Sequence, residues 1–375
     1  MSQLKVNSVV DASGGNTATI NTYTPTESNM GGKNRIINGD MRIDQRNAGA
    51  SVTPSSGSSY TLDRWKNYNS QASKLSFQQN AGSVTPPVGF TNYLGATSLS
   101  AYSVGSSDEF DLYQLIEGYN IADLGWGTAN AKTVTLSFWV RSSLTGTFGG
   151  SVQNSGGSRT YPFSYTISAA NTWEQKSVTI SGDTSGTWLT TNGVGISLLF
   201  SLGAGSSVVG TAGSWTGTSA VGVTGATSVV GTSGATFYIT GVQLEVGSVA
   251  TPFERRDYGR ELMLCQRYYY RNTAPSGSQY GSGYNDSTAN AFFNIPFPVT
   301  MRTSPTALEQ SGTAGNYAIQ RSGDFPACTS VPVFDSANTQ SAFVRFTSTG
   351  NLTAGQGSSA RSANSAGYLG WSAEL

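Results

Sequence analysis

The stretch that decides the fold is Phe237-Tyr-Ile-Thr-Gly-Val-Gln-Leu-Glu-Val-Gly247. Its large apolar residues recur at or near every second position, which is the period of a β-strand with one buried face. Gly241 interrupts this alternation and indicates a β-bulge or a close approach of another segment. Pro252 and the charged run after it predict the end of the sheet. The stretch therefore predicts the last strand of a β-domain.

The period changes after residue 257. Four residues then follow at spacings of i, i+4, i+7 and i+11, on one face of a short helix: Tyr258, Leu262, Cys265 and Tyr269. A second domain therefore begins here. We predict an arm over residues 1–33, a large β-domain over 34–257 and a smaller one over 258–375.

Both predicted domains consist of short strand-like runs separated by turn residues. In the first they are 35–37, 74–78, 110–115, 133–141, 174–180, 194–202 and 237–246. In the second they are 268–270, 291–299, 306–308, 317–320, 341–348 and 367–375. Many short strands without a long helix predict an all-β protein built of sandwiches. The last run reaches the final residue, so we expect the C-terminus to be tied into a sheet.

Three groups of residues resemble one family. The stretch 237–245, with Thr251-Pro-Phe-Glu254 and Cys265-Gln-Arg-Tyr-Tyr269, is similar to the end of the carbohydrate-binding-module-like jelly roll of bacteriophage tail-fibre and virion-surface proteins. Residues 34–46 with Tyr60-Thr-Leu-Asp-Arg-Trp65 resemble the opening of this module, and 134–141 its central strand. Cys265 to Tyr269 followed by 297–306 resembles a small β-domain at the C-terminal ends of phage fibres.

The resemblance implies a jelly-roll β-sandwich followed by a second, smaller β-sandwich, in a structural protein of a phage virion. It favours a tail fibre, made in the host cytoplasm and displayed on the virion surface, that recognises host-surface polysaccharide. Fibres are usually threefold, so a homotrimer is expected. A head fibre or capsid decoration protein with the same modules is the first alternative, and a glycan depolymerase is a second, disfavoured one.

Composition excludes several functions. Lys plus Arg and Asp plus Glu both number 21, and only 11% of residues are charged, so no bulk field favours nucleic acid or an anionic membrane. No apolar stretch approaches the length of a membrane span, so membrane insertion is not expected. The chain has no histidine, which removes the commonest general base and zinc ligand. We therefore predict no enzymatic activity.

Two polar features bear on cofactors and disulfides. The acidic cluster Asp108, Glu109 and Asp111 is interpreted as the solvated start of a strand or as ligands of a structural Ca²⁺. No other cofactor is expected. Cys265 and Cys328 are too few for a disulfide framework, and Cys265 is expected as a buried thiol, with a bridge between the two disfavoured.

Aromatic side chains are the candidates for sugar contact, because a pyranose offers C–H faces to rings and hydroxyl edges to polar neighbours. We select Trp188, Trp215, Tyr280 and Tyr284. The two tryptophans are expected to be exposed because they lie in polar, turn-like surroundings. The Gly/Ser/Thr-rich segment 203–234 is either a flexible loop or a loop laid over the sheet and pinned by Trp215.

The first 33 residues carry only weak strand signals, at Leu4, Val6, Val9 and Val10. They are too few to bury a core. Either they form a disordered tail or they order against a partner. Tail-fibre-like proteins usually attach to the particle through this end, so we predict an attachment arm that binds other virion proteins.

Overall fold

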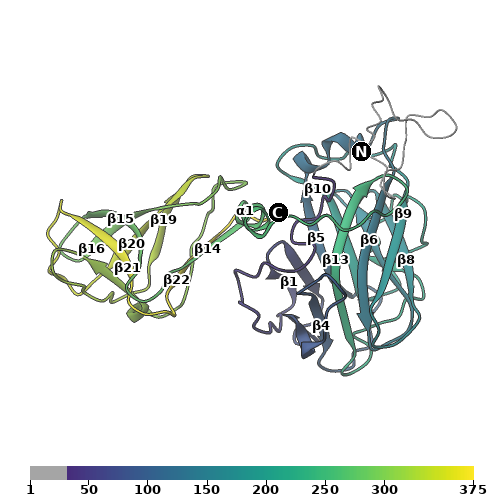
Figure 1. Ribbon diagram of the computed structural model, residues 1–375, viewed down its shortest axis with the longest axis horizontal. Coiled ribbons are helices and arrows are strands. Elements are labelled where there is room, and N and C mark those ends of the chain that lie inside the picture. Colours follow the sequence, from purple (N-terminus) through teal and green to yellow (C-terminus); the bar gives the residue numbers. More distant parts are fainter. Residues whose placement is uncertain (1–31) are drawn as a thin grey trace, which may run out of the picture.

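The computed structural model describes residues 32–375 of the chain, and these form two lobes joined near helix α1 (Tyr258–Gln266) (Figure 1). Besides α1 and four short 3₁₀ helices, the regular structure of this part is all strand. The prediction of an all-β protein is therefore confirmed. The attachment residues Leu4, Val6, Val9 and Val10 lie outside the described residues.

The larger lobe contains two antiparallel sheets. The six-stranded sheet runs in the order β1 (Gly57–Leu62), β2 (Trp65–Asn69), β5 (Glu109–Glu117), β10 (Val194–Ala204), β7 (Gly146–Gln153), β8 (Thr160–Ile167). The five-stranded sheet runs in the order β3 (Leu75–Gln79), β4 (Leu94–Ser98), β13 (Thr236–Val246), β6 (Val134–Ser142), β9 (Glu174–Ile180). A short parallel pair, β11 (Val209–Gly210) and β12 (Gly222–Val223), lies in the loop after β10.

The core of this lobe lies between the two sheets. Phe138 of β6 contacts Phe200 of β10 and Tyr165 of β8 edge-to-face, with ring centroids 5.0 and 4.9 Å apart. Alternate residues of both sheets point into this layer, so each sheet keeps one outer face. This is the sandwich that the alternation predicted.

The break at Gly241 is a bulge in β13, as predicted. The register of β13 against β6 shifts between Thr240 and Gln243, and Gly241 has a φ of 62°. A Cβ atom at this position would lie 2.6 Å from the Phe90 ring. Glycine is therefore required both by the backbone conformation and by the close approach of Phe90.

The prediction of a strand at 35–37 is wrong. The backbone N–H groups of Ile36 and Ile37 donate to side chains, those of Asn34 and Gln114, at 2.9 Å each. Side-chain acceptors therefore replace a strand ladder in this buried segment.

The smaller lobe also has two sheets around a core of its own. One runs β18 (Tyr317–Gln320), β21 (Gly357–Ser362), β15 (Gln279–Asn285), β16 (Asn290–Pro296), β20 (Ser341–Thr347), β19 (Val333–Ala337). The other runs β14 (Tyr269–Thr273), β22 (Tyr368–Ser372), β17 (Glu309–Gln310). In β20, Ala342, Val344 and Phe346 are buried and Arg345 is exposed, as the alternation predicted.

The junction between the lobes holds α1, β14 and the C-terminus (Figure 1). Asp257 caps α1 by accepting a hydrogen bond from the Arg260 N–H at 2.8 Å. Cys265 of the predicted helical face is buried and Tyr258 is 57% exposed, whereas Tyr269, also buried, lies beyond the helix at the start of β14. Cys265 and Cys328 are both buried and unbridged.

Buried charged groups connect the lobes. The Glu374 carboxylate pairs with Arg64, whose guanidinium lies 3.6 Å from the centre of the Tyr268 ring. Glu117 accepts two hydrogen bonds from Arg267, at 2.7 and 3.0 Å, and one from the Tyr268 hydroxyl at 2.6 Å. The C-terminus is thus tied into the fold, as predicted. Within residues 32–375, no helix has the length and apolar character needed to cross a membrane.

Candidate functional site

The outer face of the six-stranded sheet carries a groove of about 200 Å³. It follows from the alternation of β5, in which Phe110 and Leu112 point into the core. The residues between and beside them, Glu109, Asp111 and Tyr113, therefore point outward. The complete lining comes from four strands and one loop: Tyr68, Glu109, Asp111, Tyr113, Gln153, Ser197, Leu199, Ser219 and Val221.

Strand register brings the aromatic and acidic residues together. Tyr68 of β2 lies directly opposite Asp111 of β5, and Leu199 of β10 lies opposite Tyr113. Residues opposite each other in an antiparallel pair have Cβ atoms about 5 Å apart. The groove floor is therefore a strip of two half-exposed phenol rings with a carboxyl group between them.

One wall of the groove is the loop that follows β10. Gln153 of β7 donates from its side-chain amide to the Ala220 carbonyl at 2.9 Å, which holds Ser219 and Val221 beside the sheet. Farther back, Thr216 exchanges two backbone hydrogen bonds with Thr160 of β8, at 2.8 and 3.0 Å. The segment 203–234 is therefore laid over the sheet, the second of the two alternatives predicted for it.

The two carboxyl groups of the groove differ in burial. Asp111 is 1% exposed, and its Oδ1 atom has no hydrogen-bond partner among the described residues. Burial, and then the neighbouring Glu109 carboxylate, raises the pKa of Asp111 well above its usual value, and the Ser201 hydroxyl opposes this rise in part. Burial also raises the pKa of Glu109, which is half-buried. Both carboxyl groups are therefore partly removed from water before any ligand binds.

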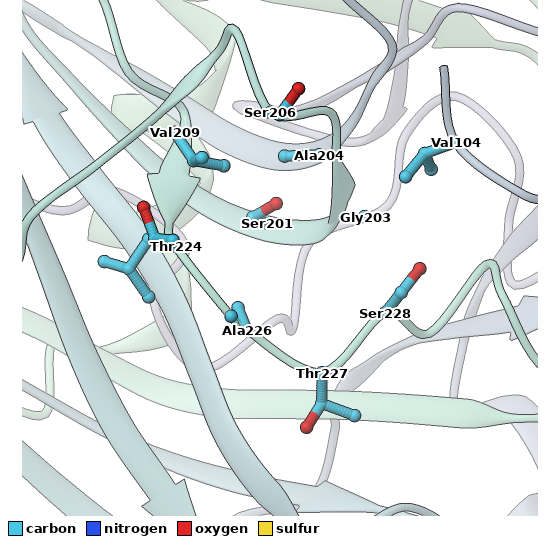
Figure 2. Close-up of a pocket in the computed structure, with 12 residues that line it drawn as sticks. Val104, Ser201, Gly203, Ala204, Ser206, Val209, Thr224, Ala226, Thr227 and Ser228 are labelled. Carbon is cyan, nitrogen blue, oxygen red and sulfur yellow. The ribbon is translucent and has the colours of Figure 1, made fainter. Parts of the chain in front are cut away.

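A second hollow, of about 300 Å³, lies on the same face near the end of β10. Figure 2 shows its lining, which consists of small aliphatic and hydroxyl-bearing residues such as Val104, Ser201 and Thr224. No described lining residue is aromatic or charged. It therefore lacks the ring faces and ionisable groups that distinguish the groove.

The opposite face of the sandwich is covered. The segment before β4 packs Ala81 and Tyr93 onto Tyr238 of the five-stranded sheet. The Tyr93 hydroxyl donates to the Ala81 carbonyl at 2.6 Å, and the Trp173 indole donates to the Thr85 carbonyl at 2.9 Å. Part of the outer face of the five-stranded sheet is therefore covered by side chains of its own lobe.

The structure corrects the expected exposure of Trp188. This side chain is only 7% exposed, and its ring centre lies 4.7 Å from that of Trp126 and 5.5 Å from that of Trp215. Its indole donates to the Asp183 carboxylate and to the Ser185 carbonyl, at 3.3 and 3.2 Å. Trp215 is half-buried against the same cluster. Although the neighbours of Trp188 and Trp215 in the sequence are polar, the two side chains pack with Trp126 in a cluster of three indole rings that holds loops together.

We expect Trp188→Phe to lower the free energy of unfolding by about 2 kcal/mol, because it removes indole volume and a hydrogen bond shared between two acceptors from a packed cluster. Urea unfolding followed by fluorescence measures this. Trp173→Phe is the matched control, since Trp173 also donates one indole hydrogen bond but lies outside this cluster. Equal stability of both variants and the parent would contradict a structural role for Trp188.

The other two aromatic candidates, Tyr280 and Tyr284, differ in their exposure to solvent. Tyr280 is 4% exposed and belongs to the core of the smaller lobe, so it is unsuited to sugar contact. Tyr284 is 46% exposed and lies beside Phe292 and Phe343, whose rings stack at 5.6 Å on the outer face of their sheet. These three rings form a second aromatic surface, which lines neither the groove nor the second hollow.

The acidic cluster does not converge on one point. Asp108 accepts hydrogen bonds from the Tyr102 hydroxyl and the Gly105 N–H, at 2.8 and 2.7 Å, in the turn before β5. Among residues 32–375 no group of three or more Asp, Glu, Cys or His could hold a metal ion. The structure places Asp108 in this turn, and Glu109 and Asp111 in the groove.

Tyr68, Tyr113 and Gln153 line the groove but were not predicted as site residues from the sequence. Asp111 and Tyr113 are two positions apart in a strand that was predicted, so alternation alone could have placed them on one face. Tyr68 lies on β2, which was not predicted, and its place opposite Asp111 depends on a long-range register.

No protein-family model matches the chain, and no curated protein matches it. Among solved structures, a putative sugar-binding protein from Bacteroides thetaiotaomicron is similar at 14% identity over 57% of this chain and 100% of its own, with a TM-score of 0.35. A family 11 carbohydrate-binding module from Clostridium thermocellum, in complex with a mixed-linked tetrasaccharide, is similar at 11% identity over 53% and 100%, with a TM-score of 0.26.

The enzymatically active domain of tailspike protein 4 from bacteriophage CBA120 is similar at 10% identity over 57% of this chain, with a TM-score of 0.32. The match spans about a fifth of that chain, 21%. At these identities and TM-scores the similarities carry no conclusion about ligand or activity.

Proposed function

We propose that this chain is a non-enzymatic structural protein of a bacteriophage virion surface, a tail fibre that adheres to host glycan through the groove on the six-stranded sheet. The observation that carries the adhesive role is the combination of Tyr68, Tyr113 and the buried Asp111, whose Oδ1 atom has no partner among the described residues, in one groove. Rings supply a face for the C–H side of a sugar, and carboxyl and amide groups accept and donate at its hydroxyl edge.

The virion assignment rests on the resemblance of three sequence segments and on the low charge of the chain. In this proposal the first 33 residues attach the protein to the particle, and three copies assemble in parallel. A groove of this size binds only a short sugar segment, so adhesion depends on several copies acting together. A head fibre or capsid decoration protein would use the same groove.

The two carboxyl groups of the groove, Glu109 and Asp111, raise the question of whether the protein hydrolyses glycan. Glu109 and Asp111 are neighbours on one face of one strand, about 7 Å apart by strand geometry. Glycosidases place their two carboxyl groups on either side of the bond that is cleaved. Two groups on the same wall suit hydrogen bonding to one edge of a sugar, so we propose binding without cleavage.

The test incubates the protein with a panel of bacterial surface polysaccharides. Co-sedimentation measures binding, and size-exclusion chromatography of the polysaccharide measures chain length. We expect at least one polysaccharide to bind with unchanged length. Shortening would overturn the non-enzymatic assignment, and the absence of binding to every polysaccharide would overturn the adhesive one.

A further inference from the structure

The groove has an asymmetric charge. Its described lining carries two carboxyl groups, Glu109 and Asp111, and no Lys or Arg. The nearby cation, Lys66, lies outside the lining, with its ammonium 5.5 Å from the ring centres of both Tyr60 and Tyr113. A ligand in the groove therefore meets two carboxyl groups, with phenol rings beside them and Lys66 opposite Tyr113 in the strand register.

Asp111 is the group that most requires a ligand. It is almost completely buried and its Oδ1 atom has no partner among the described residues, while Glu109 on the same face adds a second carboxyl group. A buried acceptor without a donor lowers stability, and a ligand that supplies the donor recovers that free energy on binding. A charged donor recovers more than a neutral one.

We propose that the groove binds an amino sugar, with a protonated amine directed at Asp111 and Glu109 and the sugar face on Tyr68 and Tyr113. A bound ammonium favours the ionised form of both carboxyl groups, against the effect of burial on their pKa, and phenol rings attract cations. An acetylated nitrogen is neutral, so it lacks the charge attraction. A uronic acid in the same position would place like charges together. The inference rests on the proposed adhesive function and adds the class of sugar.

The experiment compares three oligosaccharides of equal length by isothermal titration calorimetry at about pH 6, where amines are protonated. The probes are oligomers of glucosamine, N-acetylglucosamine and galacturonic acid. We expect the glucosamine oligomer to bind at least about tenfold more tightly than the acetylated one, as one charged hydrogen bond allows, and the acidic oligomer not to bind. Asp111→Asn should weaken binding of the glucosamine oligomer more than binding of the acetylated one, which reduces the tenfold preference to less than about threefold.

Asp108→Asn is the matched control, because Asp108 lies in the preceding turn and outside the groove. It should retain the full preference. If Asp111→Asn does not fold, Glu109→Gln, at a half-buried position, tests the same charge and should also lower the preference.

Equal affinity for the two hexosamine oligomers, or an unchanged preference in Asp111→Asn, would overturn the amino-sugar inference while the adhesive function stands. Failure of all three oligomers to bind would overturn the inference. Binding that is unaffected by alanine at both Tyr68 and Tyr113 would instead contradict the groove as the adhesive site.

Discussion

Replacing Tyr68 and Tyr113 together by alanine should weaken binding of a short glycan by about 100-fold, because tyrosines in a partly enclosed site are typical binding hot spots, each contributing about 1–2 kcal/mol. The two rings are half-exposed and form the apolar part of the groove. Without them, a sugar retains only hydrogen bonds that water can replace. Isothermal titration calorimetry with a short oligosaccharide measures the change, because a short ligand cannot bind several copies of the protein at once.

The matched control is Tyr119→Ala. Tyr119 is an exposed tyrosine of the same lobe that does not line the groove. The Tyr119→Ala variant should bind the glycan with the affinity of the parent protein. All variants should keep the parent's circular dichroism spectrum, since none of the three rings belongs to the core between the sheets. Loss of binding in the control, or full binding by the double variant, would argue against the groove.

The second large effect is expected at the junction between the lobes. Glu374→Ala should lower the free energy of unfolding by about 3–5 kcal/mol, because it leaves the Arg64 guanidinium buried without its carboxylate. Arg64 is 1% exposed, and it also donates to the Leu115 carbonyl, so it cannot turn outward without losing further contacts. Urea unfolding measures the loss.

Asp324→Ala is the control for this prediction. It breaks the Arg321–Asp324 ion pair of the smaller lobe, in which the Asp324 side chain is 56% exposed, so a change below about 1 kcal/mol is expected. If Glu374→Ala were as mild as this control, the C-terminal ion pair would contribute little to holding the lobes together.

Some strand-like runs were predicted with the limits that the structure has. Residues 174–180 and 317–320 form strands with the predicted limits, β9 and β18. Strands β7 and β8 were missed for different reasons. β7 is rich in glycine, and β8 contains Pro162, which a strand tolerates at the edge of a sheet, where β8 lies. Residue propensity therefore did not predict β7 and β8, because their position in the sheet determines that they are strands.

The candidate site was harder to predict than the fold. The acidic cluster before 110–115 was recognised, but a solvated strand start describes only Asp108, which lies in the turn, and not Asp111, which is buried. Trp188 and Trp215 lie among polar residues in the sequence, yet Trp126 brings them into a buried cluster. Such clusters, like the pairing of Tyr68 with Asp111, arise from contacts between distant segments, which the period of a single strand does not contain.

Glycan binding on the outer face of the six-stranded sheet is tested most directly by a crystal structure of the protein soaked with an oligosaccharide. We expect sugar rings over Tyr68 and Tyr113 with a polar group within hydrogen-bond distance of Asp111. Sugar located instead on the Tyr284, Phe292 and Phe343 surface of the smaller lobe, with the groove empty, would contradict it.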